Sequence, residues 1–134
     1  MTSDTLTLLS IAVLGLLVFV LGANVTRHRA QRGATGTQMP TDPSDRLLIA
    51  QRAHGNAAEY APMLAVLLVV SSALTDGWWV PTLAVVAVVA RLLHAVGMLR
   101  STTLATHGPL RDIGAMGTYL AGVALSITVL VAAW

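Results

Sequence analysis

Four apolar stretches, each long enough to cross a bilayer as a helix, occupy most of this 134-residue chain. A helical span needs about 20 consecutive apolar residues. Soluble domains carry roughly 25% charged residues, whereas this chain has 10% and a mean hydropathy of +0.74. Because backbone polar groups must be paired within lipid, the sequence predicts an integral membrane protein built from helices.

We predict an all-α, four-helix membrane bundle that forms one domain over residues 1–134, with spans at about 5–27, 46–73, 78–99 and 110–133. The segment from Asp42 to Asp45 is typical of a turn followed by a helix start. Pro81 falls in the first turn of the third span, where proline is tolerated, whereas Pro62 falls inside the second. The first span is interpreted as a retained anchor, because positive charge follows it instead of preceding it.

Arginine placement predicts the orientation of the bundle. Positive residues are retained on the cytoplasmic side of a membrane, so we expect both termini outside and loops one and three in the cytoplasm, with a bacterial inner membrane as the location. There is no basic run of the kind that binds nucleic acid. The arginines of loops one and three that carry this argument are Arg27, Arg29, Arg32, Arg46, Arg100 and Arg111.

Three polar residues of the second span share one helical stripe. At 100° per residue, Arg52, Asn56 and Glu59 fall on the same face, whereas His54 points away and is interpreted as a packing residue. Ionisable groups inside a membrane cost about 2.5 to 3.5 kcal/mol on insertion scales, so they normally face a partner, a ligand or the bundle interior. The stripe is therefore a candidate binding surface.

A second polar face lies in the third span, where Arg91 and His94 are three residues apart. One carboxylate cannot neutralise two buried arginines, so an anionic ligand would balance the surplus positive charge, especially if Arg111 also turns inward. The alternative is that Arg and Glu side chains pair across helices and fix the bundle register. No metal is expected, because the chain has no cysteine and no paired-histidine spacing.

Three segments together resemble the MAPEG family, the membrane-associated proteins of eicosanoid and glutathione metabolism. The first is Arg52-Ala-His-Gly-Asn56-Ala-Ala-Glu59-Tyr60-Ala-Pro62, which is similar to the second-helix signature of the family. The other two are Ala90-Arg91-Leu-Leu-His94-Ala-Val-Gly97-Met98 and Arg111-Asp-Ile-Gly114-Ala-Met-Gly-Thr118. Their order and their helices match the family, and the resemblance covers nearly the whole chain.

The resemblance implies a left-handed bundle that assembles as a homotrimer, with a thiol-tripeptide site between neighbouring subunits. Arg91, His94 and Arg111 are then expected to meet the Arg52 stripe across a subunit boundary. Arg111 would stand close to the sulfur as the catalytic residue. The residues expected to bind glutathione, or another low-molecular-weight thiol, as co-substrate are Arg52, Asn56, Glu59, Tyr60, Arg91 and His94.

The implied activity is a membrane-bound transferase or peroxidase that activates a thiol as thiolate for attack on lipophilic electrophiles or hydroperoxides. A guanidinium beside a thiol favours the thiolate. Asp112 could instead pair with Arg111 and remove that effect. The alternatives are a non-catalytic bundle that binds a lipid or thiol ligand, and a small transporter. In every case the helices contact membrane lipids.

Overall fold

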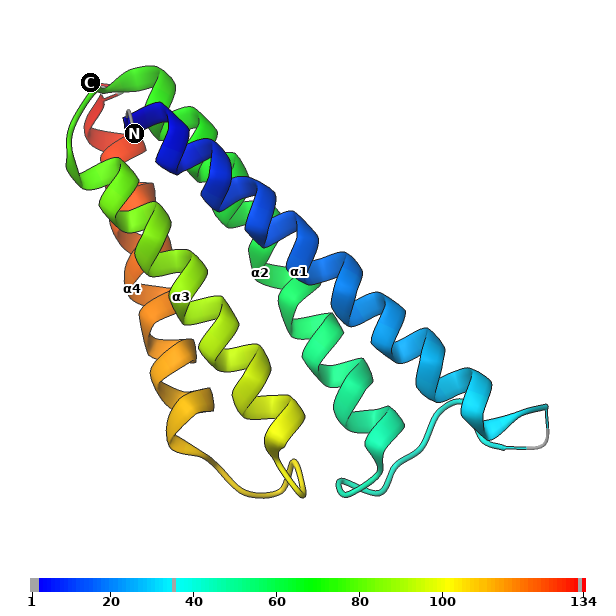
Figure 1. Cartoon of the computed structure of the whole chain (residues 1–134). Coiled ribbons are helices and arrows are strands. Elements are labelled where there is room, and N and C mark those ends of the chain that lie inside the picture. Colours follow the sequence, from blue (N-terminus) through cyan, green and yellow to red (C-terminus); the bar gives the residue numbers. More distant parts are fainter. Residues whose placement is uncertain (1–2, 35, 133) are drawn as a thin grey trace.

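The computed structural model describes residues 3–34, 36–132 and 134, and within them the chain forms four helices and no strand. These are α1 (Ser3–Arg32), α2 (Arg46–Leu74), α3 (Trp79–Arg100) and α4 (Pro109–Ala132) (Figure 1). Each is long and apolar enough to cross a membrane. The prediction of an all-α integral membrane protein is confirmed.

α1 extends to Arg32, beyond residue 27, where the first span was expected to end. Its last turn contains Arg29 and Arg32, and cations there interact favourably with the carbonyl end of the helix dipole. Gly33 follows with φ of 67°, the left-handed conformation that commonly terminates a helix, and its N–H contacts the Ala30 carbonyl at 3.2 Å. The expected end of the fourth span at residue 133 lies outside the described residues.

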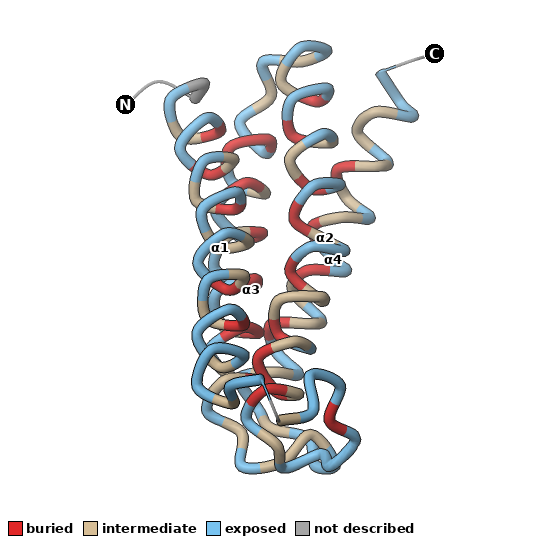
Figure 2. Tube along the Cα trace, turned by 90° about the vertical axis from the view of Figure 1, so that its right-hand side faces the viewer, coloured by how far each residue is buried: buried red, intermediate tan, exposed pale blue. Residues whose placement is uncertain are grey.

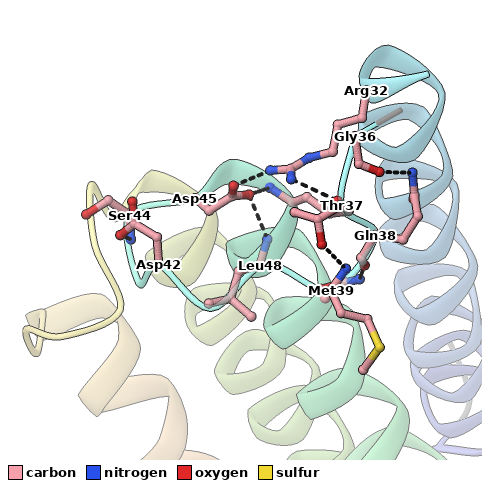
Figure 3. Close-up of polar contacts among 11 residues, drawn as sticks. Arg32, Gly36, Thr37, Gln38, Met39, Asp42, Ser44, Asp45 and Leu48 are labelled. Atoms are coloured by element: carbon pink, nitrogen blue, oxygen red, sulfur yellow. Dashed lines mark hydrogen bonds and ion pairs between the residues drawn. The ribbon is translucent and has the colours of Figure 1, made fainter. Parts of the chain in front are cut away.

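Loop one is held to the start of α2 by an ion pair between Arg32 and Asp45 (Figure 3). Asp45 is the N-cap of α2, and its Oδ1 accepts from the backbone N–H groups of Leu47 at 2.8 Å and Leu48 at 3.3 Å. Arg32 also donates to the Thr37 carbonyl at 2.9 Å. The hydrogen bond from Arg32 keeps the pKa of the Asp45 carboxyl below its usual range. One carboxylate thus both starts α2 and anchors the loop.

The four helices form a rhombus in cross-section, with α2 and α3 on the short diagonal. α1 and α4 each pack against both α2 and α3, but α1 and α4 do not contact each other within the described residues. The start of α1, the α2–α3 connection and the end of α4 share one end of the bundle, and loops one and three share the other (Figure 1). Buried residues follow the facing sides of the helices (Figure 2).

The apolar core fills the half of the bundle nearer the termini. Its largest fully buried members include Leu14, Leu68 and Leu125. Outward faces are apolar as well, with Phe19 78% exposed and Leu120 64% exposed, as expected where lipid is the solvent. The other half of the interior, toward loops one and three, contains a smaller apolar cluster and the buried polar side chains of α3.

Small residues let α4 approach α3 closely. A Cβ added at Gly114 would lie 2.6 Å from the Ala90 carbonyl oxygen, and one at Gly117 would lie 2.9 Å from the Ala90 Cβ. Thr118 is buried one turn beyond Gly114. A Cβ added at Gly122 would lie 3.8 Å from Leu64 Cδ2 on α2, which is ordinary van der Waals contact. The small residues Gly114, Gly117 and Thr118 therefore form a packing surface, as is usual in membranes.

Candidate functional site

A cavity of about 430 Å³ opens among α2, α3, α4 and loop three. We refer to it as the basic cavity, because two arginines, Arg52 and Arg111, line it. It brings together residues that are far apart in sequence and that sequence analysis had singled out. Its lining consists of Arg52, Asn56, His94, Met98, Leu104, His107, Arg111, Asp112, Ala115 and Tyr119.

Arg91 is fully enclosed behind the cavity, with 1% of its surface exposed. Its Nη2 donates to Asn56 Oδ1 at 2.7 Å, and its Nη1 donates to Thr118 Oγ1 at 3.5 Å. The Thr118 hydroxyl can accept because its own proton goes to the Gly114 carbonyl at 2.7 Å. Arg91 therefore orients the Asn56 amide from behind and does not itself line the cavity.

Tyr60 lies beside Arg91 at the edge of the site. The Arg91 Cζ lies 5.3 Å from the centre of the Tyr60 ring, a distance typical of a cation–π contact. The Tyr60 hydroxyl is 3.4 Å from the hydroxyl of Tyr119 on α4, and the ring centres are 5.8 Å apart. Tyr60 of α2 thus contacts α4 through Tyr119.

His94 connects α3 to the first turn of α4. Its Nδ1 lies 2.8 Å from the Arg111 carbonyl oxygen, and because a carbonyl only accepts, Nδ1 carries the proton. Gly97 allows α3 and α4 to approach closely at this point, since a Cβ there would lie 2.6 Å from the backbone nitrogen of Arg111. The backbone of Arg111 is fixed on α3, and its side chain starts from a defined position at the cavity.

Arg111 and Asp112 do not pair with each other, so the pairing considered from the sequence is wrong. The Asp112 carboxylate instead contacts His107 Nδ1 at 3.2 Å, and Arg111 Nη1 makes a long contact of 3.5 Å with the Thr106 carbonyl. Adjacent helical residues point about 100° apart, which separates the two side chains. The Arg111 guanidinium is therefore not neutralised by its neighbour.

Arg52 and Glu59 are exposed in the single chain. Within the described residues neither makes a hydrogen bond or an ion pair, and Arg52 lines the basic cavity whereas Glu59 lies one turn beyond Asn56, outside the lining. His54 packs against α1, where a Cβ at Gly22 would lie 3.2 Å from its Nε2. Its interpretation as a packing residue agrees with this position.

The two halves of the site lie in one chain, which corrects the expectation that a subunit boundary separates them. Arg91 contacts Asn56 directly, and His94 and Arg111 line the same cavity as Arg52. The physical reason is that α2 packs against both α3 and α4, so the stripe on α2 faces them within the bundle.

Comparison with known families settles the identity at the level of the family. The family model of the MAPEG family matches residues 7–131, nearly the whole chain. The chain belongs to the MAPEG family. No curated protein matches its sequence. The MAPEG family is associated with membrane-bound glutathione-related transferase and peroxidase activities and with eicosanoid metabolism. These are the activities to consider for the basic cavity of this MAPEG protein.

Several cavity residues of this MAPEG chain were not found by sequence reasoning. Tyr119 directly follows Thr118 on α4. An aromatic pair with Tyr60 of α2 could have been suggested only once the helix neighbours were known. His107 lies in loop three, where periodicity carries no information. Asp112 was considered only as a partner of Arg111. The described residues contain no cluster of three potential metal ligands.

Proposed function

We propose that this protein is a membrane-bound, glutathione-dependent transferase or peroxidase. The observation that carries the proposal is the basic cavity, which Arg52 and Arg111 both line and where neither is paired with a carboxylate. Arg91 adds a third positive charge directly behind it. A ligand with carboxylates, such as glutathione, would balance this charge and accept the arginine hydrogen bonds.

In this proposal the α2 stripe binds the peptide part of the thiol. Arg52 binds a carboxylate, the Asn56 amide binds a peptide group, and Glu59, exposed on the same stripe, binds the ammonium group. Arg91 and Tyr60 act from behind by holding Asn56 and the cavity wall, as their contacts support. His94 fixes the first turn of α4 through the Arg111 carbonyl.

Arg111 is the proposed catalytic residue. A free thiol has a pKa of about 8.5 and is mostly protonated at neutral pH, and a nearby guanidinium stabilises the thiolate. Lowering the thiol pKa by one unit requires about 1.4 kcal/mol of preferential interaction with the thiolate. The absence of an Arg111–Asp112 pair supports this role, because the full charge of Arg111 is available to the sulfur.

We further propose that residues 1–134 form one membrane domain that assembles as a homotrimer, with loops one and three in the cytoplasm of a bacterial cell. Glu59 supports oligomerisation, because it is exposed on a membrane-spanning helix in the single chain. A charged group facing lipid costs about 2.5 to 3.5 kcal/mol. A neighbouring copy over this face would remove the carboxylate from lipid and place the basic cavity next to a subunit boundary.

A second candidate is a non-catalytic bundle that binds a lipid. An apolar groove of about 580 Å³ between α2 and α4 favours it, because the surface that lines this groove is mostly apolar. In the enzyme the same groove would hold the lipophilic acceptor. The two functions therefore differ in whether a thiol binds and ionises in the basic cavity.

The test is calorimetric titration of the detergent-purified protein with glutathione, combined with ultraviolet absorbance of the thiolate, for the wild type, Arg52→Ala and Arg111→Ala. Binding should be lost in Arg52→Ala and retained in Arg111→Ala, with thiolate absorbance lost in the latter. Arg27→Ala is the matched control, because Arg27 is exposed at the same end of the bundle but outside the cavity. Absence of binding by any low-molecular-weight thiol would reject the transferase and favour the lipid-binding candidate.

A further inference from the structure

Tyr119 lines two different cavities of the molecule. Its side chain borders the basic cavity together with Asn56 and Arg111, and it also borders the apolar groove between α2 and α4. The groove continues along both helices, past Met63, Leu67, Val123, Ile127 and Leu130. A polar reactant in the first cavity and an apolar one in the second would meet at this tyrosine.

The hydrogen bonding of Tyr119 leaves its proton available. The hydroxyl oxygens of Tyr60 and Tyr119 are 3.4 Å apart, and each hydroxyl can donate or accept. When Tyr60 donates, Tyr119 is the acceptor in this pair. Within the described residues its own O–H has no acceptor, and about half of the residue is exposed, at 51%. A hydroxyl that accepts one hydrogen bond becomes a better donor for the next. Tyr119 therefore presents a proton where the two cavities meet.

The position of this proton is fixed by a chain of contacts that begins in the bundle interior. Arg91 is held by Asn56 and Thr118 and lies over the Tyr60 ring. Tyr60 in turn contacts both the ring and the hydroxyl of Tyr119. A donor held by its neighbours in this way loses little conformational freedom when it acts, which is the requirement for effective proton transfer.

We propose that Tyr119 donates its proton to an oxygen atom of the lipophilic acceptor, an assignment that rests on the proposed function. The thiolate sulfur forms a bond to an acceptor carbon, the carbon–oxygen bond breaks with its electron pair on oxygen, and that oxygen takes the Tyr119 proton. The tyrosinate regains a proton from water, which had received the proton of the ionising thiol. Thiol and acceptor combine with no other reactant.

This role makes the enzyme selective for the atom that leaves the acceptor. An electrophile that gives an alkoxide, such as an epoxide with an apolar substituent, needs a proton and gains from Tyr119. An aryl chloride releases chloride, which needs no proton. The ratio of the two rates therefore depends on the Tyr119 hydroxyl, whereas a general loss of structure would lower both rates together.

The experiment measures kcat/KM with glutathione for styrene oxide and for 1-chloro-2,4-dinitrobenzene, in the wild type and in Tyr119→Phe, with Tyr60→Phe as the matched loss of one hydroxyl. General acid catalysis contributes typically about 10²- to 10⁴-fold. We therefore expect the epoxide-to-chloride ratio to fall about 100-fold or more in Tyr119→Phe and by a smaller factor in Tyr60→Phe. A solvent deuterium isotope effect on epoxide opening should be present in the wild type and absent from Tyr119→Phe.

The outcomes separate the two proposals. Equal loss with both acceptors, or no loss with either, would overturn the role of Tyr119 while leaving the transferase intact. A wild type that binds no thiol and converts neither acceptor would overturn the transferase itself, and the proton donor with it. Glutathione titration of Tyr119→Phe identifies a variant that has lost its fold, and Tyr119→His, which restores a donor of similar reach, should then recover part of the ratio.

Discussion

Arg91 Nη2 and Asn56 Oδ1 are 2.7 Å apart, and this hydrogen bond joins α3 to α2 in the interior of the bundle. Within the described residues Arg91 forms no ion pair, so an amide and a hydroxyl, and not a carboxylate, are its hydrogen-bond partners. Asn56 thus has one side bound to a buried cation and the rest of its amide facing the basic cavity. Stability and ligand recognition are coupled through this one side chain.

Replacing Asn56 with alanine should lower the free energy of unfolding by about 1.5 to 3 kcal/mol, the usual range for a hydrogen bond to a charged group. The measurement is equilibrium unfolding in mixed detergent micelles. The double variant Asn56→Ala/Arg91→Met removes both partners and should be more stable than the sum of the single variants predicts, with a coupling of about 1 kcal/mol or more. Strict additivity of the two single changes would contradict the contact.

Gly114→Ala should destabilise the bundle by about 1 to 3 kcal/mol, the range for overpacking a closely packed interface. The added Cβ would lie 2.6 Å from the Ala90 carbonyl oxygen, which belongs to helix backbone and cannot turn away. Gly15→Ala is the matched control, because nothing lies within 4 Å of a Cβ at that position of α1, and there alanine should be neutral or stabilising through helix propensity. Thermal unfolding of both variants provides the comparison.

The Arg32–Asp45 ion pair should make stability depend on pH in the acidic range. Because the folded pKa of Asp45 lies below its ordinary value of 3.8, its contribution is fully present above that value and is lost as the pH falls through the lower, folded pKa. Asp45→Asn keeps a good N-cap but removes the charge. The difference in melting temperature between wild type and Asp45→Asn should therefore be constant from pH 5 to 7 and shrink below about pH 4. A difference in melting temperature that grows as the pH falls would contradict this prediction.

His94→Leu should weaken the attachment of the first turn of α4 by about 0.5 to 1.5 kcal/mol, the net contribution of a typical hydrogen bond. The affected contact is the one from Nδ1 to the Arg111 carbonyl at 2.8 Å. His94→Asn retains an N–H donor near the position of Nδ1 and should recover part of the loss. Hydrogen exchange at the amides of residues 109–114 would detect this local effect, and identical exchange in both variants would argue against the contact.

The helices could be predicted from the sequence because an apolar run of membrane length leaves the backbone no alternative to internal hydrogen bonding. Helical phase also placed Arg52 and Asn56 on one face and His54 on another, and the structure has Arg52 and Asn56 in one cavity and His54 against Gly22. Those inferences needed only the period of the helix. The length of α1 beyond Arg27 was missed, because hydrophobicity marks where a span ends and not where the helix ends.

The partners of each face could not be predicted in the same way. Close packing, such as that of Gly114 on Ala90, decides which helices face each other. Helical phase alone does not predict these neighbours. The contact of His94 with a backbone carbonyl, and that of Asp112 with His107, depend on the path of loop three. Because the neighbours of each helix could not be predicted, the enclosure of Arg91 within a single chain was not foreseen.

The order of the Arg91 contacts along the chain has a consequence for biosynthesis. Asn56 lies on α2 and leaves the ribosome before Arg91, whereas Thr118 lies on α4 and leaves it later. A guanidinium entering the bilayer costs about 2.5 to 3.5 kcal/mol on insertion scales, and its amide partner is already there when α3 arrives. We expect the α1–α2 hairpin to act as the receiving surface for α3, with α4 inserting after α3 and packing against it.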